Sequence, residues 1–250
     1  MSISIFERRT ALLLGEEGLD ALHKAHVILF GVGGVGGYVA EALARSGVGR
    51  LTLVDDDTVA PSNLNRQIIA LNSTIGQDKV EVARRRILDI NPNCQVDVVQ
   101  MFYTPDTADK LSLEGASYVV DAVDTVTAKL EIIGRAKAAG VPVISCMGTG
   151  NKLHPELLTL TTLEKTTGCP LARVMRKECR ARGYKNVQVV YSPEKPITPL
   201  SLPSEGETPA GGGLRPGSAK KQTPGSVSFV PGAAGLIIAG KVVRDITGQP

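Results

Sequence analysis

Short apolar runs alternate with amphipathic stretches along the amino-terminal part of the chain. The runs lie at residues 27–30, 51–55, 95–100, 117–121 and 142–146, and stretches with helical spacing lie between them, notably at about 78–90 and 128–139. This alternation predicts an α/β fold in which a parallel sheet carries helices on both faces. Apolar runs near 157–161, 187–191 and 226–230 predict further strands that extend the sheet in mixed orientation.

Residues 192–226 break this pattern. They contain seven prolines and six glycines with few apolar residues between them. Such a segment buries too little surface to offset the entropy cost of ordering it. We therefore expect a mobile, Pro/Gly-rich loop inside a single domain that spans 1–250. The apolar stretch 233–240 is too short to span a bilayer, which takes about 20 residues, and predicts a core helix.

A glycine-rich turn follows the first predicted strand. Gly31, Gly33 and Gly36 have the G-x-G-x-x-G spacing of a phosphate-binding loop. In such a loop the first glycine makes the turn, the second admits a phosphate to the backbone, and the third lets the helix pack closely on the strand. Asp55 ends the second predicted strand, where a ribose hydroxyl would lie. The pattern predicts a Rossmann-like nucleotide site.

Charged residues beyond Asp55 favour a triphosphate over a dinucleotide. Arg66 and Lys79 could neutralise phosphate oxygens, and Asp124 could hold a magnesium ion. A cationic pair also stabilises a departing pyrophosphate. A nicotinamide dehydrogenase needs little charge beyond the helix N-terminus, so these residues argue against hydride transfer. We predict ATP and Mg²⁺ as ligands.

Five motifs, in this order, resemble those of the ubiquitin-activating-enzyme-like adenylating superfamily: Gly31-x-Gly33-Gly34-x-Gly36, Val54-Asp55-x-Asp57-x-Val59, Ser62-Asn63-Leu64-Asn65-Arg66-Gln67, Gly76-x-x-Lys79 and Asp121-x-x-Asp124. The resemblance implies attack of a carboxylate on the α-phosphate of ATP, which gives an acyl-adenylate and pyrophosphate. It implies that Asp55 holds the ribose, that Asp124 holds magnesium, and that Arg66, Lys79 and Asp124 take part in catalysis. The full set of nucleotide-binding residues it implies is Gly31, Gly33, Gly34, Gly36, Asp55, Asp57, Asn63, Arg66, Gln67 and Lys79.

Three further segments, at residues 7–18, 148–155 and 165–173, are similar to the tRNA threonylcarbamoyladenosine dehydratases. Those enzymes convert threonylcarbamoyladenosine, just 3′ of the anticodon, to its cyclic form. The resemblance implies a tRNA partner and a homodimer in which an arginine crosses the interface, with Arg8 and Arg9 as candidates. A sulfur-transfer protein is a further candidate partner.

The cysteines bear on which branch of the superfamily applies. Cys94, Cys146, Cys169 and Cys179 form no C-x-x-C pair, which argues against the structural zinc site of many sulfur-carrier activators. Cys169 precedes Pro170 at a predicted helix start and is either a thioester nucleophile or a small buried cysteine. Because the sequence has neither a signal peptide nor a membrane-spanning stretch, we expect a cytoplasmic protein that does not contact membranes.

Two basic clusters are candidates for contact with RNA. One is Arg84-Arg85-Arg86, and the other follows one side of a predicted helix through Arg173, Arg176, Lys177 and Arg180. The opposite side of that helix, expected to pack inward, carries Leu171, Val174, Met175 and Cys179. A solvated amphipathic helix explains the second cluster equally well. With no tryptophan and nine tyrosines and phenylalanines, RNA recognition would rest on backbone contacts and shape.

The residues and the resemblance together favour ATP-dependent cyclisation of threonylcarbamoyladenosine in tRNA through an acyl-adenylate. Three alternatives stay open at this point. The first is an adenylyltransferase that activates the C-terminus of a sulfur-carrier protein. The second is a nucleotide sensor without turnover, and the third is a dehydrogenase.

Overall fold

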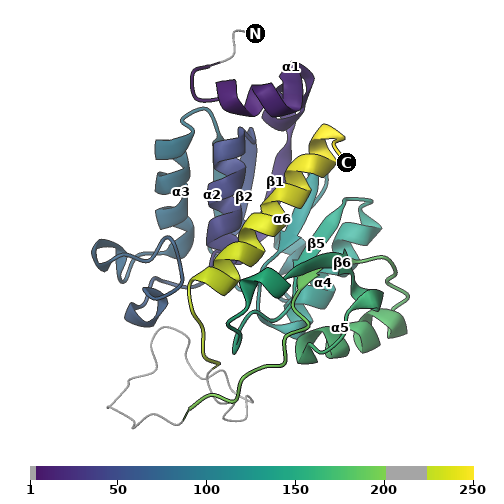
Figure 1. Cartoon of the computed structure of the whole chain (residues 1–250). Coiled ribbons are helices and arrows are strands. Elements are labelled where there is room, and N and C mark those ends of the chain that lie inside the picture. The colour runs from purple at the N-terminus through teal and green to yellow at the C-terminus, as the bar shows by residue number, and fades with distance from the viewer. Residues whose placement is uncertain (1–3, 201–223) are drawn as a thin grey trace.

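Seven strands form one sheet in the order β3-β2-β1-β4-β5-β7-β6 in the computed structural model, which describes residues 4–200 and 224–250 (Figure 1). The strands are β1 (His26–Phe30), β2 (Arg50–Val54), β3 (Gln95–Val99), β4 (Tyr118–Asp121), β5 (Val143–Cys146), β6 (Thr159–Thr162) and β7 (Gln188–Tyr191). The helices are α1 (Arg8–Lys24), α2 (Gly36–Ser46), α3 (Lys79–Ile90), α4 (Val126–Ala138), α5 (Pro170–Ala181) and α6 (Phe229–Thr247). Short 3₁₀ turns lie at Pro61–Asn63, Asn72–Thr74, Ala108–Lys110, Pro155–Leu157 and Leu163–Lys165.

The sheet is parallel except at one edge. β1 lies between β2 and β4 and is parallel to both, and β6 is antiparallel to β7. This arrangement confirms the predicted parallel sheet with a mixed extension. The chain moves from β1 to β2 on one side and later returns to β4 on the other. Ligands of open α/β sheets bind at such a switch point, outside the carboxyl ends of the strands.

Alternating side chains of the central strands enter two separate apolar cores. In β1, Val27 and Leu29 belong to one core, whereas Ile28 and Phe30 belong to the other. Residues of α2, α3 and α6 contribute to the first core, and residues of α4 and α5 contribute to the second. The two-residue period of a strand therefore produces the layered arrangement of helices on both faces seen in Figure 1.

The predicted strand at 226–230 is wrong, because α6 begins at Phe229. Val230, Pro231 and Ala234 are buried in the helix, and proline is tolerated in a first helical turn. The short apolar run is the start of the core helix that the sequence predicts at 233–240. A Cβ built on Gly235 would lie 2.5 Å from the Val35 carbonyl oxygen, so α6 packs directly against the start of α2.

Most of the predicted loop at 192–226 lies outside the described residues. Its described flanks, 192–200 and 224–226, contain neither helix nor strand. Both flanks are bound to Asn151, whose carbonyl accepts a hydrogen bond from Ile197 N (2.8 Å) and whose side chain accepts one from Gly225 N (2.6 Å). No helix within the described ranges is both long and apolar enough to cross a membrane.

Candidate nucleotide-binding site

The glycine loop joins β1 to α2 at the carboxyl edge of the sheet. Gly31 has φ +85°, and a Cβ there would lie 2.7 Å from the Ala122 carbonyl oxygen. A Cβ on Gly36 would lie 1.8 Å from the Gly31 carbonyl oxygen, so no other residue fits. Gly33 and Gly34 have ordinary space, with neighbours at 3.7 and 3.4 Å. The fold therefore requires two of the four predicted glycines, and the other two leave the loop accessible at the start of α2, where backbone amides bind anions.

Asp55 supports the glycine loop. Its Oδ2 accepts a hydrogen bond from Val32 N (2.6 Å) and its Oδ1 accepts one from Asp57 N (2.9 Å). Burial raises the pKa of this carboxyl group, against the opposing effects of Lys79 and of the two backbone donors. The structure thus places Asp55 beside the loop, as the sequence predicts.

Lys79 is the first residue of α3 and reaches the same edge. Its Nζ lies 2.8 Å from Asp57 Oδ2, and its side chain is 6% exposed whereas that of Asp57 is 37% exposed. The Lys79 backbone N–H also donates to the Asp57 carbonyl (3.0 Å). The ammonium group is held beside the Asp55–Asp57 segment, and its partner faces solvent.

The segment between β2 and α3 covers the loop from the other side. Asn63 is buried and its Oδ1 accepts a hydrogen bond from Ala60 N (3.0 Å), which fixes the turn. Arg66 donates to the Ser62 carbonyl (2.8 Å). Gln67 faces the glycines, because a Cβ on Gly33 would lie 3.7 Å from its Nε2. Gln67 Oε1 is buried and accepts no hydrogen bond from the described residues, which leaves an unsatisfied acceptor at the site.

Asp124 lies in the turn from β4 to α4, next to the glycine loop. A Cβ on Gly31 would lie 3.1 Å from Val123 N, so this turn contacts the loop directly. The Asp124 side chain is exposed and has no hydrogen-bond or ion-pair partner among the described residues. It is therefore an available carboxylate beside the glycine loop.

The sequence did not predict a fully buried ion pair that lies next to this turn. Lys129 Nζ lies 3.1 Å from Asp121 Oδ2, and both side chains are 0% exposed. Lys129 also donates to the Cys146 carbonyl (2.6 Å), and Ser145 donates to Asp121 (2.5 Å). Asp121 Oδ1 also accepts a hydrogen bond from Val123 N (3.2 Å). The pair joins the ends of β4 and β5 to α4 and supports the turn that carries Asp124. A lysine within the apolar stretch Ala128–Ile133 is the sequence signal for it.

Ligand oxygens of Asp55, Asp56 and Asp57 lie within 4.8 Å of one another. Asp55 uses both oxygens for backbone amides, and Asp57 holds Lys79. The carboxylates of Asp55 and Asp57 are therefore already bound to protein groups. The Asp124 carboxylate is the more available metal ligand.

The four cysteines are buried and unpaired. Burial raises the pKa of Cys94 and Cys179 to about 11 and that of Cys146 to about 12, so these three stay protonated near neutral pH. Cys169 precedes α5, as the sequence predicts, and is 3% exposed. A Cβ on Gly148 would lie 3.8 Å from its Sγ, so the thiol packs under the strand end.

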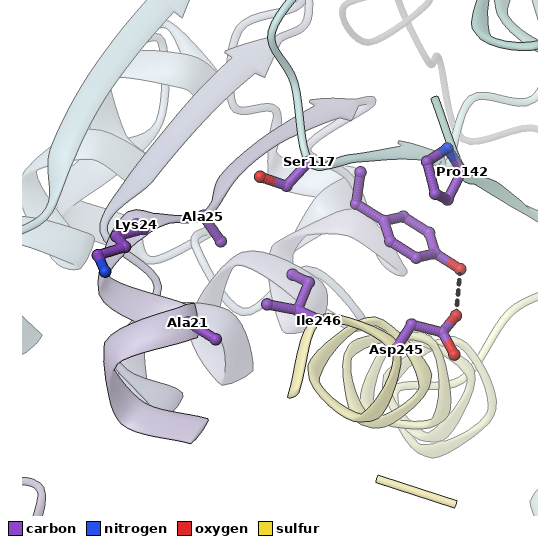
Figure 2. Close-up of a pocket in the computed structure, with 8 residues that line it drawn as sticks. Ala21, Lys24, Ala25, Ser117, Pro142, Asp245 and Ile246 are labelled. Atoms are coloured by element: carbon purple, nitrogen blue, oxygen red, sulfur yellow. Dashed lines mark hydrogen bonds between the residues drawn. The ribbon is translucent and has the colours of Figure 1, made fainter. Parts of the chain in front are cut away.

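A cavity of about 270 Å³ lies at the opposite, amino edge of the sheet. Figure 2 shows it between the ends of α1 and α6, where the Tyr118 hydroxyl donates to Asp245 (2.8 Å). Its lining consists of Ala21, Lys24, Ala25, Ser117, Tyr118, Pro142, Asp245 and Ile246. None of the predicted site residues lines this cavity.

The two basic clusters differ in structure. Arg84 contacts Glu81, Arg85 contacts Gln77 and Arg86 contacts Glu41. In α5, Arg176 donates to the Thr166 carbonyl (2.8 Å), whereas Arg173, Lys177 and Arg180 are exposed. The predicted inner face of this helix is wrong at Val174, which is 41% exposed. Ala172, Met175 and Cys179 are the buried residues, because they face the second core.

Sequence and structure comparisons identify the family of this chain. The chain belongs to the ThiF family, whose model matches residues 6–250. The chain is 43% identical over 239 residues to the tRNA threonylcarbamoyladenosine dehydratase of Bacillus subtilis, covering 95% of this chain and 93% of that protein.

Crystal structures of Escherichia coli tRNA N6-threonylcarbamoyladenosine dehydratase, TcdA, in complex with ATP and with AMP each superimpose with a TM-score of 0.83. These are 33% and 34% identical to this chain and cover 99% of it and 98% of the neighbour. The molybdopterin-synthase adenylyltransferase of Escherichia coli matches a shorter part, at 38% identity over 58% of this chain.

Proposed function

We propose that this protein is an ATP-dependent tRNA threonylcarbamoyladenosine dehydratase. The observation that carries the proposal is the glycine loop at the switch point, surrounded by a buried lysine and by an aspartate and a glutamine acceptor that have no partner among the described residues. The similarity to enzymes of this name extends over nearly the whole chain, including the part beyond the nucleotide site. A ThiF-type nucleotide site by itself is shared with the adenylyltransferases, so the substrate assignment rests on this full-length similarity.

In the proposed reaction the threonyl carboxylate of the modified base attacks the α-phosphate of ATP and pyrophosphate leaves. A nitrogen of the same base then closes the ring on the activated carbonyl and releases AMP, which carries away the oxygen that the dehydration removes. Amides at the start of α2 bind phosphate oxygens. Asp55 holds the ribose, and Lys79 and Arg66 neutralise charge that develops on the departing pyrophosphate. The Ser62 carbonyl and Asp57 hold these two cations at the site.

Lys79 has to change partner for this role. Its ammonium group lies on Asp57 in the structure, and a polyphosphate brings a higher negative charge to the same place. Because the Asp57 carboxylate is partly exposed, water can solvate it when the lysine turns to phosphate. Gln67 supplies a fixed polar contact for the base or sugar from the opposite wall.

The residues present also fit a magnesium ion. Asp124 provides a carboxylate beside the glycine loop that has no partner in the described part of the chain, and Mg²⁺ in nucleotide sites is held by one or two carboxylates together with phosphate oxygens. When bound, the ion would shield the charge of the phosphates. Lys129 and Asp121 hold the turn on which Asp124 lies.

For the assembly of this protein we propose a homodimer. On α1, Leu12 and Leu13 are 85% and 83% exposed, and Ile5 just before the helix is 87% exposed. Adjacent exposed leucines on one helix are typical of an interface. Arg8 and Arg9 begin the same helix, and either would be carried toward a neighbouring subunit. Light scattering should give a dimer for the wild type and a monomer for Leu12→Asp/Leu13→Asp.

We propose a cytoplasmic location, because tRNA is the proposed substrate. A sulfur-transfer protein stays a predicted partner.

The test uses cells that lack their own dehydratase. Expression of this chain should convert threonylcarbamoyladenosine in tRNA to the cyclic nucleoside, read by mass spectrometry, and Lys79→Met should leave the tRNA unconverted. Calorimetry of the purified protein should detect ATP with Mg²⁺ and not NAD. Tight NAD binding without ATP binding would contradict the adenylation reaction. Unconverted tRNA despite ATP binding would instead favour the sulfur-carrier adenylyltransferase or the nucleotide sensor.

A further inference from the structure

We propose that the exposed side of α5 is a docking surface for the phosphate backbone of the tRNA substrate. The α5 basic row consists of Arg173, Lys177 and Arg180. All three side chains are exposed, and none forms a hydrogen bond or ion pair within the described residues. The inference rests on the proposed function, because it requires that RNA be brought to the nucleotide site.

The row has the geometry of a linear contact. Its members are four and three residues apart, so they lie on one side of the helix. At 1.5 Å per residue the row covers about 10 Å along the helix axis. On the opposite side Ala172, Met175 and Cys179 are buried. The helix is therefore fixed by its apolar side, and the three cations project from a rigid support.

The row starts at the edge of the sheet that carries the glycine loop. A Cβ on Gly148, just beyond β5, would lie 3.8 Å from Leu171 Cβ, and a Cβ on Gly168 would lie 2.6 Å from the Pro193 carbonyl oxygen, just beyond β7. Both contacts place the first turn of α5 at the carboxyl ends of the strands. Figure 1 shows α5 at the end of the molecule opposite α1. An RNA whose modified base enters the site would extend its backbone along this helix.

The charge of the row is not neutralised by its own helix. Glu178, the acidic residue of α5, pairs with Arg182 (2.6 Å). Glu164, which precedes the helix, accepts a hydrogen bond from Asn186 N (2.8 Å). The Arg84-Arg85-Arg86 cluster contrasts with this, since Arg84 pairs with Glu81 and Arg86 with Glu41, which leaves Arg85, bound to the neutral Gln77, as its one cation without an acidic partner among the described residues. Of the two clusters in the sequence, the structure assigns RNA contact to the one on α5.

The contact is electrostatic and independent of base sequence. With no tryptophan in the chain, and with none of the row's members aromatic, the helix offers charge and no stacking surface. Each phosphate neutralised releases condensed counterions, so log K falls linearly with log salt, with a slope of roughly 0.7 to 0.9 for each contact.

The test compares two triple variants with the same change in net charge. The first is Arg173→Gln/Lys177→Gln/Arg180→Gln. The control is Lys24→Gln/Arg45→Gln/Arg50→Gln, whose residues lie at the amino edge of the sheet and pair with Asp20, Glu41 and Asp97. Binding of tRNA that carries threonylcarbamoyladenosine is measured across a series of salt concentrations, together with ATP binding by calorimetry.

For the α5 variant we expect the salt slope to fall by about 2 to 3, and the affinity at about 0.1 M salt to drop by roughly 100-fold, with ATP binding unchanged. The control should keep the wild-type slope. Equal slopes for the α5 variant and the wild type would overturn the inference while leaving the proposed function intact. Equal losses in both variants would overturn it too, because general charge would then explain binding. A wild-type protein that binds ATP but not tRNA would contradict the inference and the proposed function together.

Discussion

Two lysine–aspartate pairs flank the glycine loop, and they differ in their access to water. The Lys129–Asp121 pair below the β4–α4 turn is completely buried, and Ser145 and the Cys146 carbonyl satisfy its remaining polar atoms. The Lys79–Asp57 pair beyond β2 has a lysine that is only 6% exposed, but its aspartate is 37% exposed. The Lys129–Asp121 pair, called the sealed pair, has no room to exchange partners. The Lys79–Asp57 pair, called the open pair, can release its lysine to a ligand.

This difference gives the two pairs different roles: the buried pair supports the structure, and the partly exposed pair takes part in the reaction. Removing one member of a sealed pair leaves a buried charge without a countercharge or water, which is strongly destabilising. Removing the lysine of an open pair leaves a carboxylate that water can reach, which costs little stability. The sealed pair should therefore control folding, and the open pair should control turnover.

The largest effect is expected for Lys129→Met. It leaves the Asp121 carboxylate buried without its cation, so the free energy of unfolding should fall by about 3 to 5 kcal/mol. Urea denaturation followed by circular dichroism measures this. The double variant Lys129→Met/Asp121→Asn removes the stranded charge and should recover much of the loss. A single variant as stable as the wild type would remove the distinction between the two pairs.

Lys79→Met should have the opposite profile. Loss of a cation that stabilises the departing pyrophosphate should lower kcat by about 100- to 1000-fold, while the free energy of unfolding changes by less than about 1 kcal/mol. Pyrophosphate release and urea denaturation give the two values. If Lys79→Met unfolded as readily as Lys129→Met, both pairs would be structural and the chemistry would lie elsewhere.

Asp124→Ala tests the turn that the sealed pair supports, since Asp124 lies on it. We expect activity to fall by about 100-fold through loss of a metal ligand, with an unchanged fold because the side chain is exposed. The measurement is turnover over a range of Mg²⁺ concentrations, with the exposed Asp106→Ala as control. Activity near that of the wild type would mean that magnesium is held by other residues.

The smallest effect is expected for Cys169→Ala. This substitution tests whether the buried Cys169 thiol forms a thioester during the reaction. Ring closure within the modified base needs no protein nucleophile, so turnover should stay within about threefold of the wild type. Single-turnover cyclisation measured by mass spectrometry provides the test. Loss of the cyclic product while ATP–pyrophosphate exchange persists would point to a thioester and support the sulfur-carrier-like alternative.

The sequence predicts those parts of this molecule that depend on local pattern. The β1 run, the glycine spacing and the position of Asp55 all follow from strand periodicity and from the steric needs of a turn, and the structure agrees with each. The strand predicted at 226–230 is wrong because a short apolar run does not distinguish a strand from the first turn of a buried helix.

Features that depend on distant contacts could not be predicted. Lys129 meets Asp121, Ser145 and Cys146 because β4, β5 and α4 adjoin in space. The assignment of the basic clusters likewise needed the structure, since spacing does not reveal that Arg86 is bound by Glu41. The roles of Arg66, Lys79 and Asp124 in binding nucleotide and metal stay predictions, which the substitutions above test.

The most direct test of the account is a single-turnover reaction of the purified protein with ATP, Mg²⁺ and tRNA that carries threonylcarbamoyladenosine. We predict that cyclic nucleoside, AMP and pyrophosphate appear in equal amounts, and that omission of the modified tRNA leaves ATP intact. Cyclic nucleoside formed without AMP, or AMP formed while the nucleoside stays linear, would contradict the claim that this site activates the threonyl carboxylate as an adenylate.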